Sequence, residues 1–179
     1  MEADWEVEIG GGAPVIDAHW PGFVDLRADP ERIVEIAEAA DFAPLAALLL
    51  ALNALDSPVW TAKCDRWEPE SGVLASYIDM LPREGVVFSE WQQAEGFCRR
   101  YVDRLNARPL LECGPNCSVE LVVRQAVAGD AEGFGVTAYL SAKGTTGVEA
   151  AKALGAVMAG FADALPLLGP PEKTGSKLQ

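Results

Sequence analysis

Short segments in which apolar and polar residues alternate recur along this chain, and that period is typical of a β-strand with one buried face. The first covers residues 5–9, where acidic residues separate the apolar ones before three glycines end the segment. Two pairs of strands follow, one from Pro58 to about residue 80 and one over residues 118–127 and 134–142. The intervening residues 129–133, Gly-Asp-Ala-Glu-Gly, suit a hairpin loop.

Apolar residues at three- and four-residue spacing predict helices between these strands. Asp29 and Pro30 suit the start of a helix that should run to about Ala40, and residues 13–29 before it should be irregular. A leucine-rich helix from about Ala43 is predicted to lie in the core, with a homo-oligomer interface as the alternative. Its predicted buried stripe is Leu45, Leu48, Leu49, Leu52 and Leu55.

One amphipathic helix is predicted after each strand pair, and the first starts at a capping-box sequence, Ser89 to Gln92. The predicted buried residues are Trp91, Ala94, Cys98, Tyr101 and Leu105 in one helix and Val148, Ala151, Leu154, Met158, Phe161 and Leu165 in the other. Two strand-strand-helix units after a strand and two helices predict an α+β fold, a mostly antiparallel sheet with helices packed on it. We expect one domain over residues 1–166 and a flexible tail over residues 167–179.

The negative charge of the chain is concentrated near its start. The net charge is −13 over 179 residues, and residues 1–41 carry −9 of it. Such a field repels nucleic acids and anionic membranes and attracts basic partners. With no signal-peptide pattern and no catalytic or cofactor signature, our first hypothesis is a non-catalytic cytoplasmic interaction protein, an adaptor or a toxin-neutralising protein that presents its acidic surface to a basic protein.

Polar and aromatic residues should gather on the outward face of the sheet. If all strands pair in the expected register, this face carries Thr61, Lys63, Tyr77, Asp79, Thr137, Tyr139 and Ser141. Two tyrosines with a lysine and an aspartate would form an amphipathic platform, so our second hypothesis is a sensor or carrier of small molecules. An ordinary solvated sheet face explains the same residues equally well.

A second candidate site is the connection before the last helix. Lys143, Thr145 and Thr146 stand where backbone N–H groups and the positive end of a helix can hold an anion. The spacing is not that of a Walker phosphate loop, and threonine as an ordinary helix cap explains these residues as well.

The remaining reactive residues form weaker patterns. Cys113 and Cys117 flank a tight loop, but zinc needs about four ligands and the chain has a single histidine, so buried or loop thiols are favoured over a metal site. Our third hypothesis is an enzyme in which Asp65, Glu68 or Asp79 acts with Lys63 in acid-base chemistry.

Overall fold

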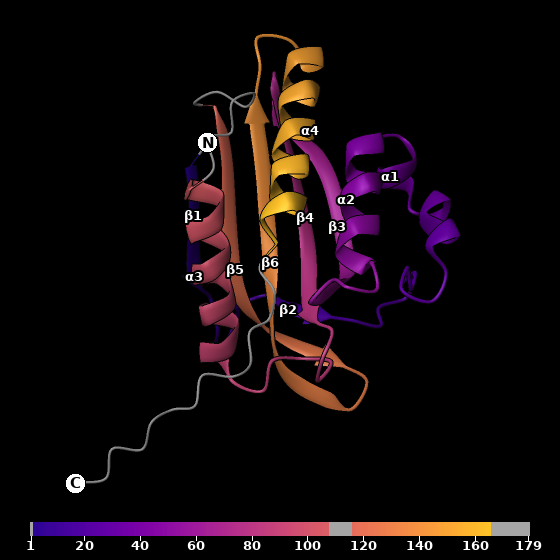
Figure 1. Ribbon diagram of the computed structural model, residues 1–179, viewed down its shortest axis with the longest axis vertical. Coiled ribbons are helices and arrows are strands. Elements are labelled where there is room, and N and C mark those ends of the chain that lie inside the picture. Colours follow the sequence, from indigo (N-terminus) through magenta and orange to yellow (C-terminus); the bar gives the residue numbers. More distant parts are fainter. Residues whose placement is uncertain (1, 108–115, 166–179) are drawn as a thin grey trace, which may run out of the picture.

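The computed structural model describes residues 2–107 and 116–165. In these residues the chain forms a mixed β-sheet with helices packed on it (Figure 1). The strands are β1 (Glu2–Val7), β2 (Val15–Asp17), β3 (Val59–Glu70), β4 (Val73–Pro82), β5 (Cys117–Ala128) and β6 (Ala131–Lys143). The helices are the 3₁₀ helix η1 (Pro30–Glu35) and the α-helices α1 (Ala37–Ala40), α2 (Ala43–Asn53), α3 (Trp91–Ala107) and α4 (Gly147–Ala164).

The sheet confirms the predicted α+β class. Its strand order is β1-β5-β6-β4-β3; the pairs among β5, β6, β4 and β3 are antiparallel, while β1 and β2 both run parallel to β5. The hairpin between β5 and β6 is tighter than the predicted loop over residues 129–133. In both hairpins a glycine with positive φ, Gly72 or Gly129, lets the chain reverse within two residues. Strand β3 therefore continues through Glu70.

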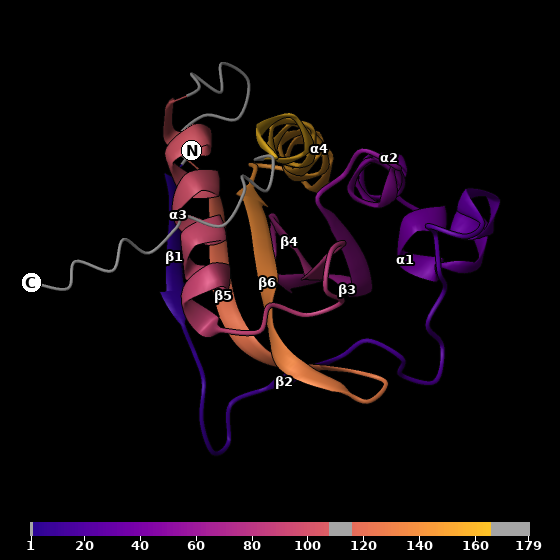
Figure 2. The same ribbon diagram turned by 60° about the horizontal axis from the view of Figure 1, so that its bottom comes forward.

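The three longer helices cover one face of the sheet (Figure 2). Helix α3 packs on β1 and β5, α4 packs on β6 and β4, and α2 lies beside α4 over β3. Aromatic side chains join α3 to α4. The ring centroids of Tyr101 and Phe161 lie 4.4 Å apart, and the Tyr101 hydroxyl donates a hydrogen bond to the Phe161 carbonyl at 2.7 Å. We call this side of the sheet the helix face.

Most of the predicted helical stripes are buried there, with exceptions at the ends of helices. Four of the five leucines predicted in the second helix are buried, but Leu55 is 93% exposed because α2 ends at Asn53. Val148 is 82% exposed because it lies in the first turn of α4, where Ala150 faces the core instead. Ser89 hydrogen-bonds the Gln93 side chain rather than completing a capping box with Gln92.

The predicted helix from Asp29 to about Ala40 is wrong as a single element. Asp29 does cap its start by accepting a hydrogen bond from the Glu31 N–H. Ile36 then adopts an extended conformation, with φ −88° and ψ 103°, which separates η1 from α1. The Ile36 side chain packs against the core, and burial of this β-branched residue competes with continued helix.

The segment over residues 13–29, predicted to be irregular, contains β2. Val15–Asp17 pairs with residues 125–127 of β5, and Ile16 is buried in a second apolar cluster on the side away from the helices. That cluster includes Trp60, Leu81 and Ala126. A three-residue strand is too short to show a period in the sequence.

A bulge changes the predicted orientation of β3. The register shifts between Thr61 and Lys63, so Trp60 and Ala62 lie in the second cluster whereas Cys64 packs against the helix-face core. The prediction that Thr61 shares a face with Lys63 is therefore wrong. Thr61 is buried towards α2, where its hydroxyl accepts a hydrogen bond from the Asn53 amide at 2.7 Å.

No helix among residues 2–107 and 116–165 is long and apolar enough to cross a membrane.

Candidate functional site

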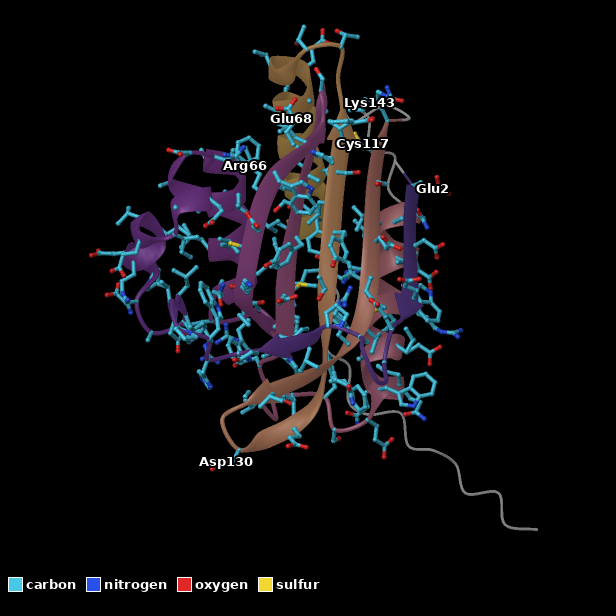
Figure 3. All side chains as sticks on the ribbon, turned by 180° about the vertical axis from the view of Figure 1, so that it is seen from behind. Glu2, Arg66, Glu68, Cys117, Asp130 and Lys143 are labelled. Carbon is cyan, nitrogen blue, oxygen red and sulfur yellow. The ribbon has the colours of Figure 1, made fainter. Side chains whose placement is uncertain are left out.

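Figure 3 shows the sheet face opposite the helices, which we call the site face. It holds the residues predicted to form a platform, with the exception of Thr61. Lys63 pairs with Asp79 across β3 and β4, and Asp79 pairs with Thr137 across β4 and β6. Tyr77 and Tyr139 are directly opposite each other in the next row, with ring centroids 6.2 Å apart. The antiparallel register thus brings these five predicted residues together.

A cavity of about 220 Å³ lies between this part of the sheet and the segment that contains β2. The sheet contributes Lys63, Tyr77, Asp79, Arg124, Thr137 and Tyr139, and the covering segment contributes Pro14, Val15, Ile16, Asp17 and Trp20. Trp20 is held in place by a hydrogen bond from its Nε1 to the Ala62 carbonyl at 3.0 Å. The ammonium group of Lys63 lies 5.4 Å from the Trp20 ring centroid, a cation–π arrangement.

Asp79 is a buried carboxyl group on the floor of this cavity, with 9% of its surface exposed. The Thr137 hydroxyl donates to its Oδ1 at 2.6 Å. Burial raises the pKa of Asp79, because an ionised carboxylate loses hydration, and this outweighs the opposing effects of the Thr137 hydrogen bond and of Arg124 and Lys63. The Asp79 carboxyl is therefore a fixed group that can accept a hydrogen bond or, when protonated, donate one.

The two tyrosines are half-buried, so each presents a ring and a hydroxyl group to the cavity. Burial, with the nearby carboxylates of Asp79 and Asp65, raises the pKa of Tyr77 to about 12. Its phenol therefore stays neutral at physiological pH and acts as a hydrogen-bonding group rather than a base.

Sequence analysis missed the covering segment and, on the sheet itself, Arg124. Arg124 is only 6% exposed, its Nη2 lies 2.8 Å from Glu8 Oε2, and the same atom donates to the Tyr139 hydroxyl at 3.2 Å. Its Nε and Nη1 atoms are buried and have no hydrogen-bond acceptor within the described part of the chain. The sequence feature that could have revealed Arg124 is a charged residue in a predicted strand, directly after the apolar run Leu121-Val122-Val123.

Ser141 does not line the cavity. Its hydroxyl is instead hydrogen-bonded to the hydroxyl of Ser118, on the neighbouring strand, at 2.7 Å. The predicted anion site is arranged as a helix cap. The Thr145 N–H and hydroxyl both interact with the Glu149 carboxylate, and the Thr146 hydroxyl accepts from the Glu149 N–H at 3.2 Å. Lys143 lies 3.7 Å from the Glu70 carboxylate.

The cysteines are separated in the structure. Burial raises the pKa of Cys64 and of Cys98 to about 12, so both are thiols at physiological pH. Cys117 is buried, and Cys113 lies outside the described residues. Among residues 2–107 and 116–165 there is no group of three or more His, Cys, Asp or Glu placed to hold a metal ion.

The acidic residues of the enzyme hypothesis are placed apart. Asp65 and Glu68 lie within β3, because that strand continues through Glu70. Glu68 accepts a hydrogen bond from the Gly72 N–H at 3.1 Å and supports the hairpin turn. Neither lines the cavity, whereas Lys63 and Asp79 both do.

No protein-family model matches the chain, and neither a curated protein nor a solved structure is significantly similar to it. The geometry of the site face therefore carries the functional argument.

Proposed function

We propose that the protein binds a small polar molecule in the cavity of the site face and acts as a sensor or carrier. The observation that supports this most is the convergence of Lys63, Asp79, Arg124 and two tyrosines from four strands on one cavity of about 220 Å³. A few polar groups at fixed positions among aromatic rings are typical of small-molecule sites.

Burial of the polar groups argues against an ordinary solvated face. The exposed fractions of Asp79, Arg124 and Thr137 are 9%, 6% and 2%. Burying such groups costs free energy unless they are well paired, so a purely structural face would be expected to carry apolar residues or fully solvated ones. Recognition of a polar ligand accounts for Arg124, which is buried with two of its nitrogens unsatisfied.

Binding explains the site better than catalysis does. The raised pKa of Tyr77 removes it as a base, and His19 contacts Phe23 and Trp60 rather than lining the cavity. Lys63 and Asp79 remain the residues through which an acid-base reaction would have to proceed.

A thermal-shift screen against a metabolite library, followed by calorimetry, tests the proposal. A compound at about 100 times its dissociation constant stabilises the folded protein by about 2.7 kcal/mol. We expect Lys63→Ala and Tyr77→Ala to abolish the shift. The matched control Lys152→Ala changes an exposed lysine on α4, on the other side of the sheet, and should keep it. Melting temperatures that no compound changes would argue against this function.

The second candidate is the acidic interaction surface, which one further observation favours. β1 is an edge strand, and Glu2, Asp4 and Glu6 are exposed along it, with Glu120 opposite Asp4 on β5. A basic protein segment could dock against this row of carboxylates. Capture of a partner that dissociates with rising salt, and that Asp4→Asn with Glu6→Gln no longer captures, is the expected result; binding that ignores salt would count against it.

We also propose a cytoplasmic location, and a homo-oligomer is a further possibility that the structure narrows to particular residues. A cytoplasmic location agrees with the unbridged thiols of Cys64 and Cys98. A homo-oligomer through α2 would have to use its exposed Leu50 and the following Leu55, because the other leucines predicted there are buried within the chain. Light scattering distinguishes a monomer from such an oligomer.

A further inference from the structure

We infer that the ligand of the site-face cavity is a small organic carboxylate, and that Arg124 holds its carboxylate group. This inference rests on the proposed small-molecule function and adds the chemical class of the ligand. It starts from the incomplete pairing of a buried guanidinium group.

A guanidinium group carries five N–H donors in a planar fork. In Arg124, the contacts to Glu8 and Tyr139 both involve Nη2, so the hydrogens of Nε and Nη1 have no acceptor in the described part of the chain. Unsatisfied buried donors are costly, and donors on a charged group are more costly than neutral ones. An acceptor that reaches these donors from the cavity would therefore gain charge-assisted hydrogen bonds.

The surrounding charges disfavour a ligand with two or more negative charges. Lys63 and Arg124 supply two positive charges at the cavity, whereas Asp17 and Asp79 line it and Glu8 already pairs with Arg124. A dianion such as phosphate would be repelled by these carboxyl groups, while a planar carboxylate matches both the charge and the geometry of the fork.

The walls suit the body of such a ligand. The rings of Trp20, Tyr77 and Tyr139 line the same cavity, so a flat or apolar carbon skeleton can lie against them while its carboxylate reaches Arg124. Position 135, opposite Arg124 on β6, is a glycine whose added Cβ would lie 2.9 Å from Ile16 Cδ1. The absence of a side chain there lets the covering segment approach the sheet and form the wall of the cavity.

The test is an NMR titration that follows the arginine Nε–H signals and the backbone amides, with benzoate, its neutral analogue benzamide and inorganic phosphate as probes. We expect benzoate to shift the Nε–H signal of Arg124 and the amides of β4 and β6 around the cavity. Benzamide and phosphate should bind at least ten times more weakly.

Two variants sharpen the test, beside a matched control. Arg124→Lys should weaken benzoate binding at least tenfold, whereas Arg99→Lys, at an exposed arginine on α3, should leave it unchanged. Glu8→Gln keeps Arg124 and removes the competing carboxylate, so it should strengthen benzoate binding several-fold even if Arg124→Lys folds poorly.

The outcomes separate this inference from the function on which it rests. Benzamide binding in the cavity as well as benzoate, or phosphate binding better, would overturn the carboxylate inference and leave a small-molecule site. Unchanged benzoate affinity in both Arg124→Lys and Glu8→Gln would overturn the role of Arg124. If neither these probes nor any compound of the metabolite library perturbs the cavity residues, the proposed function itself fails.

Discussion

The two faces of the sheet use alternate residues of the same strands, yet different interactions bury them. On β5, Leu121 and Val123 are fully buried under the helices, while Arg124 is buried on the site face through an ion pair and a hydrogen bond. On β4, Ile78 packs in the helix-face core and the next residue, Asp79, is hydrogen-bonded to Thr137. Apolar packing holds the helix face, whereas the site face combines the second apolar cluster with paired polar groups.

Low exposure of a side chain therefore has opposite energetic consequences on the two faces of this sheet. A buried apolar side chain stabilises the folded state through burial and packing, so truncating it lowers the free energy of unfolding. A buried charged group is costly even when paired, so removing it can raise stability instead. Substitutions on the two faces should therefore change stability by different amounts and in different directions.

Truncation of a core aromatic residue on the helix face should have the largest effect. Phe161 is fully buried and stacks on Tyr101, so Phe161→Ala should lower the free energy of unfolding by about 3–5 kcal/mol through lost packing and a new cavity. Urea denaturation measures this change. Tyr77→Ala on the site face removes a half-buried ring of similar size and should cost about 1 kcal/mol. Equal losses would contradict the contrast between the faces.

Overpacking beneath the covering segment should have the next largest effect. In Gly135→Ala, the new Cβ would lie 2.7 Å from Leu81 Cδ2 and 2.9 Å from Ile16 Cδ1, so we expect a loss of about 1–3 kcal/mol. Hydrogen exchange should show β2 loosening first. Gly147→Ala, where an added Cβ meets no atom within 4 Å, is the matched control and should cost nothing. Unchanged protection of β2 in Gly135→Ala would mean that the segment adapts without strain.

Neutralising the buried carboxyl group of the site face should stabilise the protein. Because the pKa of Asp79 is raised above its ordinary 3.8, the stability that its protonated form contributes is present below that pH and is lost as pH rises through the folded-state pKa. Asp79→Asn keeps an acceptor for Thr137 and avoids this loss. Its free energy of unfolding should exceed that of the native chain at pH 7 and equal it near pH 3.

Denaturation curves at both pH values check this sign. A less stable Asp79→Asn variant at pH 7 would mean that the attraction of Asp79 to Arg124 and Lys63 outweighs the cost of burying its charge. The same variant reports on the ligand, because removal of a negative charge from the cavity should strengthen benzoate binding.

Two apolar residues that the sequence predicted to be buried should have the smallest effect. Leu55 and Val148 are 93% and 82% exposed, so Leu55→Ser and Val148→Ser should change the free energy of unfolding by less than about 0.5 kcal/mol. Leu52→Ser, at a fully buried position on the same helix as the predicted stripe, should cost several times more. A large loss in Leu55→Ser would indicate that this residue is covered in solution, as in an oligomer.

Much of the site could be predicted because strand alternation is local information. The outward positions of Lys63, Tyr77, Asp79, Thr137 and Tyr139 follow from the period of two within each strand. The error at Thr61 arose from a bulge, whose extra residue reverses the orientation of the side chains beyond it without a mark in the pattern. Arg124 was missed because its importance depends on Glu8 and Tyr139, which other strands bring to it.

The α+β class, the order of the main strands and helices, and the residues of most strands that share a face all follow from the sequence alone, because hydrophobic period and turn residues act over a few positions. The tertiary structure was needed to show that β1 and β2 join β5 in parallel, that residues 14–20 close a cavity over the sheet, and that Arg124 is buried there with unpaired donors. These features depend on contacts between segments far apart along the chain, and a local sequence pattern does not indicate which distant segments come into contact.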